Sequence, residues 1–510
     1  MSDIKTSSTR AVKGASAGQS ANGNGCAGVD QIRSPYDNRV VGEMPISSAA
    51  DVERSIVRSM QAFQAMRKLP RFVRADILQR TAALLRQKKD IFVEMIAAES
   101  GKPLYDARGE VSRGVFNLEN AAAEARRFGG NEIPLDVDAA VFEYQTTDSH
   151  GRAITLSELE PSALNAMRRR VGIARRFPIG PVLGIAPFNF PLNLVLHKIA
   201  PAFAVGNSVV LKPAPQTPLT SRLLQQLFAE AGLPDGAFEV CHCSIENAES
   251  MARDERFAMV SFTGSARVGW HIKSIAGRKK VALELGGNGA VIVAEDADLD
   301  LAAMRCVRGG VVYGGQYCIG VQRILVQETV AEAFTEKLVE RVKACRVGDP
   351  MQEGIDVGPV IDEKSAIRIK AWIDEAVAAG ARLLAGGGRS GAVIEPTVLT
   401  DTKTGMKIED DEVFGPVLTV NSYKNFDAAV ARAADSRYGL QGGIFTNDLR
   451  RGFQALEEWD VGGLMINDVP IYRIDSMPFG GWKESGFGRE GTRYAMEEMS
   501  DIKLLIINYA

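Results

Sequence analysis

The sequence has little cysteine, and its few cysteines do not form a framework. It holds six cysteines in 510 residues, with no Cys-x-x-Cys pair, far below the density of a disulfide scaffold. We therefore expect a reducing, cytoplasmic setting. The run Cys241-His242-Cys243 spaces its ligands awkwardly for one tetrahedral ion and has no second Cys/His pair near it, so we expect no metal site.

Net charge and long apolar runs are also scarce. The formal net charge is −3, so no global field attracts nucleic acid or an anionic membrane, and we expect neither partner. The arginines at 168–170, 175 and 176 are more typical of a solvated or interface face than of a nucleic-acid patch. No apolar run reaches the roughly 20 residues of a membrane span, and the N-terminus lacks the apolar core of a secretory signal.

Residues 1–28 contain almost no large apolar side chains and are rich in Ser, Gly, Ala and Asn. Such a segment cannot bury enough surface to offset its ordering entropy, so we predict that it is disordered. A transit peptide is the weaker alternative, because Asp3 is present and arginine is sparse.

The region after residue 48 has a helical pattern. Ser48 can cap a helix that begins near Ala49, and apolar residues then recur on one side of the pattern up to Ser100. Gly101 and Pro103 end it. Residues 137–175, by contrast, are polar and irregular, as in an exposed hairpin or arm.

Farther along, apolar runs of strand length alternate with helical segments, which predicts parallel βαβ units. A chain of 510 residues is too long for one hydrophobic core. We therefore predict two α/β halves with a cleft between them. The expected strands lie at 181–186, 208–211, 238–240, 259–262, 290–293, 323–326 and near 418, with a helix near 220–231.

Two glycine-rich segments could carry chemistry. Residues 262–269 follow a strand and precede a helix, where backbone N–H groups favour a phosphate. The usual G-x-G-x-x-G fingerprint is absent, so a simple strand–helix turn is an equally good interpretation. Cys318 follows Gly314-Gly315-Gln316-Tyr317, and the glycines would let a cofactor approach its sulfur. A lone cysteine is nevertheless more often a small buried hydrophobe.

Two polar residues stand in apolar surroundings. Glu284 lies between two leucines, where burial would raise its pKa and suit a general base. Asn189 lies in Pro-Phe-Asn-Phe-Pro, where its amide could donate to an oxyanion. The structural alternatives are an ion-paired glutamate and a turn-forming asparagine beside proline.

Taken together, these motifs change the interpretation, because the chain resembles the aldehyde dehydrogenase superfamily from about Val29 to Tyr509. The matching segments, in order, are PFNFPLN, VVLKPA, SFTGS, LELGGN, GQYC, EVFGPV and MPFGGWKESGFGREG. The spacing from Glu284 to Cys318 also matches the family's usual one.

The resemblance implies an α/β, aldehyde dehydrogenase-like fold: two Rossmann-type α/β domains plus a β oligomerisation element. It implies an NAD(P)-binding domain from residues 29–136 and 171–285 and a catalytic domain from 286–482. The oligomerisation element would combine 137–170, which looks longer than is usual, with 483–510. Residues 503–508 are typical of an exposed apolar edge strand, so we expect a homodimer or homotetramer.

The resemblance also implies roles for single residues. Cys318 matches the nucleophile, Glu284 the carboxylate that activates water, and Asn189 the amide that holds the oxyanion together with the Cys318 N–H. The residues implied to bind NAD or NADP are Ile185, Pro187, Phe188, Lys212, Pro215, Gly264, Ser265, Gly269, Leu285, Gly286, Glu412 and Phe414. Those implied to line the substrate site are Phe190, His197, Tyr317, Arg473 and Phe479.

The implied reaction is oxidation of an aldehyde to a carboxylic acid. The Cys318 thiolate adds to the carbonyl carbon, hydride passes to the nicotinamide, and a thioester remains. Water activated by Glu284 then hydrolyses the thioester. Two rival functions stay open: a CoA-acylating enzyme, which generally lacks the activating glutamate, and a non-catalytic protein on the same fold.

Two positions depart from the usual pattern. Many NAD-preferring members carry a glutamate three residues after the ribose lysine Lys212, where this chain has Pro215, so the sequence does not decide between NAD and NADP. Many members with apolar substrates carry an aromatic residue where this chain has Arg473. A guanidinium there suits a small polar or anionic aldehyde, although pairing of Arg473 with Asp475 or another acid is an equally good interpretation.

Overall fold

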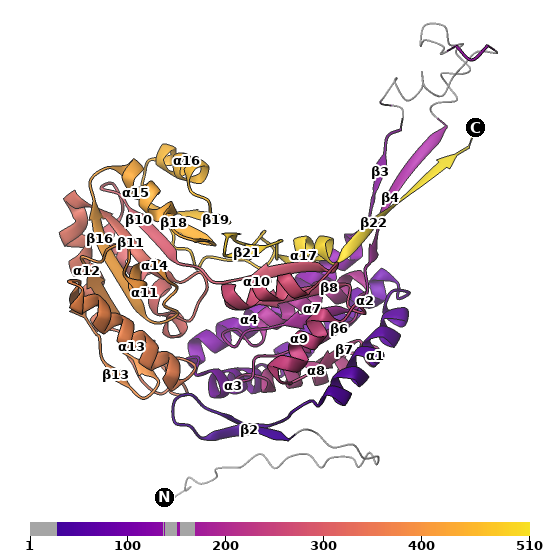
Figure 1. Cartoon of the computed structure of the whole chain (residues 1–510), viewed down its shortest axis with the longest axis horizontal. Coiled ribbons are helices and arrows are strands. Elements are labelled where there is room, and N and C mark those ends of the chain that lie inside the picture. The colour runs from indigo at the N-terminus through magenta and orange to yellow at the C-terminus, as the bar shows by residue number, and fades with distance from the viewer. Residues whose placement is uncertain (1–27, 136, 138–149, 153–168, 510) are drawn as a thin grey trace, which may run out of the picture.

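A computed structural model describes residues 28–135, 137, 150–152 and 169–509. The predicted disorder of residues 1–28 and most of the irregular segment 137–170 therefore fall outside the described residues. The described chain forms two lobes and a projecting arm, with the C-terminus at the tip of the arm (Figure 1). No helix in the described part of the chain is both long and apolar enough to cross a bilayer.

The described part of the chain begins with an antiparallel hairpin and four helices. The hairpin joins β1 to β2, and the helices are α1 to α4. Ser48 caps α1 as predicted, because its hydroxyl accepts the Asp51 N–H and the Asp51 carboxylate accepts the Ser48 N–H in return. Gly101 ends α3 with φ +72°, also as predicted. The bounds are β1 Val29–Arg33, β2 Val40–Pro45, α1 Ala49–Met66, α2 Arg71–Gln87, α3 Lys89–Ser100 and α4 Leu104–Arg127.

The first lobe is built on a six-stranded sheet of order β21-β9-β8-β5-β6-β7, parallel except for β21. Its core strands are buried apolar runs, as parallel strands covered on both faces must be. Its elements are β5 Val182–Ile185, α7 Asn193–Val205, β6 Val209–Lys212, α8 Leu219–Glu230, β7 Phe238–Val240, α9 Ile245–Arg253, β8 Met259–Thr263, α10 Ala266–Ile275, β9 Lys280–Glu284 and β21 Gly486–Phe487.

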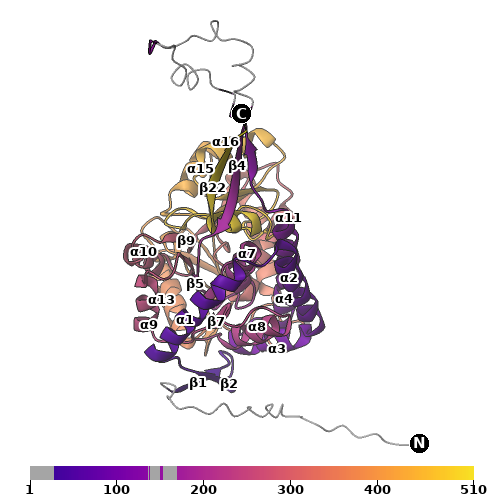
Figure 2. The same ribbon diagram turned by 90° about the vertical axis from the view of Figure 1, so that its right-hand side faces the viewer.

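Alternate residues of these strands pack against different helices. Val182 and Val209 belong to a core shared with α2, α4, α7 and α8, whereas Leu183 and Val210 belong to a core shared with α1, α9 and α10. Figure 2 shows the two helical layers on either side of the sheet. This doubly covered sheet is the Rossmann-type half predicted from the sequence.

The second lobe is built on a seven-stranded sheet of order β12-β15-β16-β11-β10-β18-β19, parallel except for β12. Its elements are β10 Gly289–Val293, α11 Leu299–Val311, β11 Val321–Gln327, α12 Ala331–Lys343, α13 Glu363–Ala378, β12 Arg382–Ala385, β13 Arg389–Ser390, β14 Val393–Ile394, β15 Thr397–Thr400, α14 Lys407–Asp410, β16 Val417–Tyr423, α15 Phe426–Ala434, β17 Tyr438–Gly439, β18 Gln441–Phe445, α16 Leu449–Glu458, β19 Gly463–Ile466 and β20 Trp482–Lys483. The predicted two-domain α/β fold is thus confirmed.

The arm is a three-stranded antiparallel sheet of order β22-β4-β3. Its strands are β3 Asn131–Ile133, β4 Arg170–Pro178 and β22 Ser500–Asn508, and the short helix α17 Thr492–Glu498 precedes β22. The predicted edge strand is therefore present, and within the described residues it pairs with β4 on one side only. The division of the chain into domains at 136, 171, 286 and 483 stays a prediction, and within the last segment β21 joins the first-lobe sheet.

Candidate active site

The segment from Glu284 to Asn288 links the two sheets, because β9 of the first lobe ends at Glu284 and β10 of the second begins at Gly289. Its two glycines stand where side chains would collide. A Cβ on Gly286 would lie 2.3 Å from Glu412 Oε2, and one on Gly287 would lie 2.3 Å from the Cys318 carbonyl oxygen. The Leu-Glu-Leu-Gly-Gly-Asn motif therefore brings the cysteine loop and Glu412 against the end of β9.

The cysteine loop leaves α11 through a tight turn at Val312–Gly315. Tyr313 has φ +48° there, an uncommon conformation for a residue with a side chain. A Cβ on Gly315 would lie 2.1 Å from the Gly415 carbonyl oxygen, so this position has no room for a side chain. The turn holds Cys318 half-buried in the wall of a cleft between the lobes.

Asn189 lies in the loop between β5 and α7, and its side chain is buried. Its Nδ2 donates to the Gln316 carbonyl oxygen at 3.0 Å, which ties the amide to the loop that carries the cysteine. The next residue on each loop makes the same connection, since the Phe190 and Tyr317 rings meet edge to face with centroids 4.8 Å apart. Asn189 and Cys318 line one cleft together.

Glu284 is buried, and its Oε2 has no hydrogen-bond partner among the described residues. Burial raises the pKa of Glu284 well above its ordinary value, and the nearby Glu490 raises it further. Burial also raises the pKa of the Cys318 thiol to about 12, with a further contribution from Glu412. Buried groups with a raised pKa are concentrated at sites that move protons.

The cleft that holds Cys318 and Asn189 has a volume of about 560 Å³. Ser265 begins α10 without capping it through its hydroxyl, so the first N–H groups of this helix are available to an anion beside the cleft. Phe414 meets Phe188 edge to face. Of the predicted cofactor residues, those that line the cleft are Ile185, Pro187, Phe188, Lys212, Pro215, Gly264, Ser265, Leu285, Gly286, Glu412 and Phe414.

Gly269 is the one predicted cofactor residue that does not line the cleft. A Cβ there would lie 2.3 Å from Leu285 Cδ2, so this glycine lets α10 pack against Leu285.

Glu412 is the one acidic side chain among the described residues that line the cleft, and burial raises the pKa of Glu412 to about 7. Pro215 places no carboxylate beside Lys212. The sequence motifs did not single out Arg368, which also lines the cleft.

A second cavity of about 480 Å³ opens beside Phe190 and Tyr317. Asn189 and Cys318, the sequence neighbours of those two aromatic residues, line the first cleft, so the two loops form the wall between the cavities. Five cationic and two acidic residues line the second cavity, which gives it a positive balance. The charged residues are Lys102, Asp106, Arg108, Glu110, Arg113, Arg308 and Arg473.

Arg473 lines this second cavity and is also ion-paired, so both interpretations of it have a structural basis. Its NH2 group lies 3.3 Å from Glu490 Oε2, and its guanidinium stacks on the Phe479 ring at 3.6 Å. His197 lies between Asp475 and Glu490, with ring nitrogens 2.9 and 3.1 Å from their carboxylates. His197 and Phe479 therefore support Arg473 from behind and do not themselves line the cavity.

The sequence patterns did not single out three charged residues of this site, which are Arg113, Lys198 and Glu490. Arg113 on α4 donates to Asp475 at 2.6 Å and to the Tyr317 hydroxyl at 3.3 Å. Lys198 on α7 donates to Thr263 at 2.6 Å and lies 3.4 Å from Glu490. Burial by itself would raise the pKa of Glu490, but Lys198 and His197 hold that pKa well below its ordinary value. The available signal for Lys198 was a lysine in a mostly apolar helix.

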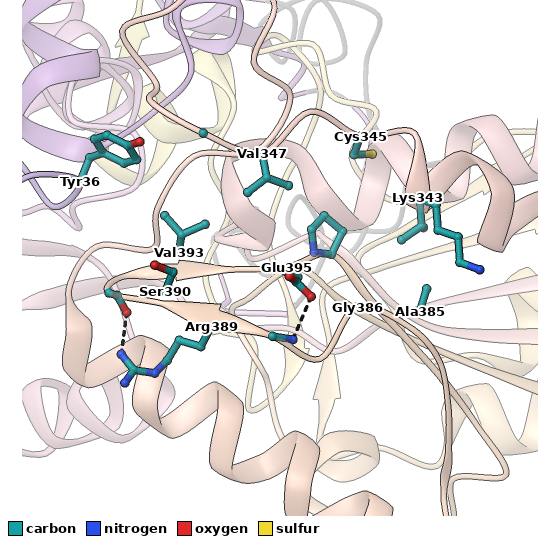
Figure 3. Close-up of a pocket in the computed structure, with 15 residues that line it drawn as sticks. Tyr36, Lys343, Cys345, Val347, Ala385, Gly386, Arg389, Ser390, Val393 and Glu395 are labelled. Carbon is teal, nitrogen blue, oxygen red and sulfur yellow. Dashed lines mark hydrogen bonds between the residues drawn. The ribbon is translucent and has the colours of Figure 1, made fainter.

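A larger cavity, about 870 Å³, lies elsewhere on the second lobe, beside the β13–β14 hairpin and the end of α12. Figure 3 shows Arg389 and Glu395 on the hairpin side and Lys343 and Cys345 on the helix side. Arg389 donates to the Gly391 carbonyl at 2.7 Å and to Glu363 on α13 at 3.0 Å, and Glu395 accepts the Gly388 N–H at 3.1 Å, so these polar groups already have partners within the protein. None of the predicted site residues lines it.

Comparison with known proteins agrees with this geometry. The model of the Aldehyde dehydrogenase family matches residues 27–505. The chain is 39% identical over 479 residues to 3-sulfolactaldehyde dehydrogenase of Priestia aryabhattai, covering 94% of each chain.

Solved structures are equally similar. Aldehyde dehydrogenase 21 of Physcomitrella patens, in complex with the reaction product succinate, is 40% identical with a TM-score of 0.88 and 96% of each chain covered. Glyceraldehyde-3-phosphate dehydrogenase GapN of Methanocaldococcus jannaschii, complexed with NADP, is 35% identical with a TM-score of 0.85, covering 94% of this chain and 98% of that one. Similar structures carry NADP or NAD+.

Proposed function

The chain belongs to the aldehyde dehydrogenase family, with NAD or NADP as cofactor, and from this premise we propose that it oxidises a small anionic aldehyde through a covalent thioester on Cys318, which Glu284 helps to hydrolyse. The observation that supports the proposal most strongly is the hydrogen bond from the Asn189 amide to the Gln316 carbonyl, which ties the proposed oxyanion donor to the loop that carries the thiol. Mass spectrometry of a working preparation should find an acyl group on Cys318.

In the first half-reaction the Cys318 sulfur forms a bond to the carbonyl carbon and the carbonyl π electrons move to oxygen. Asn189 Nδ2 and the Cys318 backbone N–H bind the resulting oxyanion, and such donors stabilise the transition state where charge develops. A nicotinamide bound in the cleft beside Glu412 and Phe414 would supply the hydride acceptor. Collapse of the oxyanion breaks the C–H bond, expels the hydride to that acceptor and leaves an acyl group on the sulfur.

In the second half-reaction water replaces the sulfur. Glu284 takes a proton from the water while the water oxygen bonds to the thioester carbon. The C–S bond then breaks and regenerates the Cys318 thiolate. The unpartnered Oε2 of Glu284 supports this role, because it leaves one oxygen of the carboxylate free for a proton. The presence of Glu284 also disfavours a CoA-acylating enzyme, in which CoA takes the place of water; product analysis with and without CoA separates the two.

The second cavity supports an anionic aldehyde as substrate. Arg113 and Arg473 both line it, and cationic residues outnumber acidic ones in its lining. Guanidinium groups in a cavity with a positive balance suit a carboxylate, sulfonate or phosphate on a short aldehyde. The similarity to enzymes named for sulfolactaldehyde and glyceraldehyde 3-phosphate agrees with this proposal.

A matched pair of substrates tests the anionic site. For glyceraldehyde 3-phosphate, Arg113→Leu and Arg473→Leu are each expected to lower kcat/KM by about 10- to 150-fold, because a hydrogen bond to a charged group contributes roughly 1.5–3 kcal/mol. For unphosphorylated glyceraldehyde the loss should stay within about 3-fold. Steady-state assays of cofactor reduction measure both. Arg108→Leu is the control, because Arg108 lines the same cavity but pairs with Glu353 in the exposed mouth. Equal losses on both substrates would reject the site.

We also propose that the arm joins copies of this chain into a homodimer or homotetramer. The strand β22 leaves five apolar side chains more than 40% exposed: Ile502, Leu504, Leu505, Ile506 and Ile507. A long apolar edge strand is rarely left uncovered in a soluble protein.

Charged residues on the arm should therefore reduce the size of the assembly. The double variant Leu504→Lys/Ile506→Lys is expected to sediment as a monomer or smaller oligomer, because lysine at an edge blocks strand pairing. Ile367→Lys, at an exposed apolar residue of α13, is the control and should sediment like the wild type. A wild-type chain that sediments as a monomer would contradict the proposal.

A further inference from the structure

A buried ion pair lies in the lining of the second cavity, against the wall that separates the two cavities. Lys102, just after α3, donates to Glu110 on α4, and both side chains are 0% exposed. Desolvating two charges costs several kcal/mol per ion unless their remaining hydrogen-bonding groups are also satisfied. The groups that satisfy this pair belong to the two loops that meet at the site.

Glu110 holds the start of α7. Its Oε1 accepts the Leu192 N–H at 2.9 Å and the Asn193 N–H at 3.1 Å, and these are among the N–H groups that a helix leaves without partners at its first turn. No side chain caps α7 from its own loop. The carboxylate therefore fixes the end of the loop that carries Asn189, three residues before Leu192.

Lys102 contacts both loops through aromatic rings. Its Nζ lies 3.6 Å from the centroid of the Phe190 ring and 4.6 Å from that of the Tyr313 ring. Phe190 follows Asn189 directly, and Tyr313 holds the left-handed position of the cysteine turn. A desolvated cation over two aromatic faces attracts both, so one ammonium group links the asparagine loop to the cysteine loop.

We propose that Lys102 and Glu110 are positioning residues that hold the Asn189 amide in register with Cys318. Glu110 fixes the loop along the axis of α7, and Lys102 fixes it against the cysteine turn. The inference rests on the proposed roles of Asn189 and Cys318. Neither residue of the pair needs to contact substrate: a shift of about 1 Å in an oxyanion donor can cost about 10²-fold in rate.

A double-mutant cycle tests the inference. Lys102→Met keeps the length of the side chain and removes the ammonium group. We expect it to lower kcat by about 10²-fold in the wild-type background and by less than about 5-fold when Asn189 is already alanine, because a misplaced amide cannot harm an enzyme that lacks it. The KM for the cofactor should change by less than about 2-fold, because Lys102 lines the other cavity.

Glu99→Gln is the matched control. Glu99 is another buried carboxylate at a helix start, since it accepts the Leu219 and Thr220 N–H groups of α8 at 2.9 and 3.1 Å. Its carboxylate hydrogen-bonds to α8 and not to the start of α7, so any loss that it causes should be the same fold in both backgrounds.

Each outcome decides the question. The positioning role would be overturned if the losses from Lys102→Met and Asn189→Ala multiplied in the double variant. It would also be overturned if Lys102→Met left kcat unchanged. If Lys102→Met does not fold, Lys102→Met/Glu110→Gln removes both charges, keeps an acceptor for the α7 N–H groups, and is read by the same criterion. If Asn189→Ala alone keeps wild-type turnover, the proposed function fails first, and that result is distinct from a lack of coupling.

Discussion

Replacing Cys318 with alanine is expected to abolish steady-state reduction of NAD or NADP by aldehydes, lowering kcat by about 10⁴-fold or more. Removing the nucleophile of a covalent mechanism costs up to about 10⁶-fold elsewhere, because no other group nearby can form the bond to the carbonyl carbon. Alanine removes only the sulfur from a half-buried position, so the fold and the cleft should persist. The assay is the rate of nicotinamide absorbance with saturating aldehyde.

Two controls separate chemistry from folding. Cofactor binding, followed by the fluorescence of the reduced nicotinamide, should keep its Kd within about 2-fold in Cys318→Ala, because the cleft has many other contacts. Cys345→Ala removes a half-buried thiol from the separate cavity on the second lobe and should leave turnover unchanged. Full activity in Cys318→Ala would overturn the covalent mechanism.

Deprotonation of the Cys318 thiol makes the rate of the first half-reaction depend on pH. Burial raises the pKa of Cys318 to about 12, so the thiolate is a minor species at neutral pH in the absence of ligands. Each unit of pH below that pKa lowers the thiolate fraction about tenfold. The rate of acylation should therefore rise with pH.

Much of the fold could be predicted from local sequence, because its elements are set by local interactions. The cap at Ser48, the end of α3 at Gly101 and the strand Phe238–Val240 all lie where the sequence pattern places them. Apolar runs of strand length gave the parallel sheets, since a strand covered on both faces needs no alternation. Strand order could not be obtained in this way, because pairing joins segments such as β21 and β9 that lie about 200 residues apart.

The residues of the site likewise divide into those with a local sequence signal and those without one. Asn189, Glu284 and Cys318 each lie in a motif, and the order of the motifs predicted that they belong together. The charged residues around them have no such signal, because their partners are remote in sequence: Lys198 and Glu490 are separated by 292 residues. Only the folded chain shows that a lysine in an apolar helix has a carboxylate to pair with.

Arg473 illustrates why a residue type alone does not fix a role. Its side chain is only 5% exposed and ion-paired with Glu490, as a structural arginine would be, and it also lines a cavity. The pairing and the proposed substrate contact do not exclude each other, because a guanidinium has five N–H donors. Its partners hold the group in place, and a donor that is already oriented loses less entropy when an anion binds.

Replacing Glu284 with glutamine should stop the cycle after the first half-reaction. Glutamine keeps the size of the side chain but cannot take a proton, so hydrolysis should slow by about 10²- to 10⁴-fold. The negative charge of Glu284 also contributes to the raised pKa of Cys318, so its loss should not hinder acylation. Rapid mixing should therefore show a burst of about one reduced nicotinamide per active site, followed by a slow steady rate.

The burst distinguishes a role in hydrolysis from a general loss of the site. Intact mass spectrometry during the slow phase should find the acyl group on Cys318, whereas Cys318→Ala should show neither burst nor adduct. Wild-type kcat should fall as the pH falls through the raised pKa of Glu284, because only the carboxylate can accept the proton; in Glu284→Gln this limb should be flat. A variant that loses the burst together with the steady rate would place Glu284 before the thioester and contradict its role as the base for water.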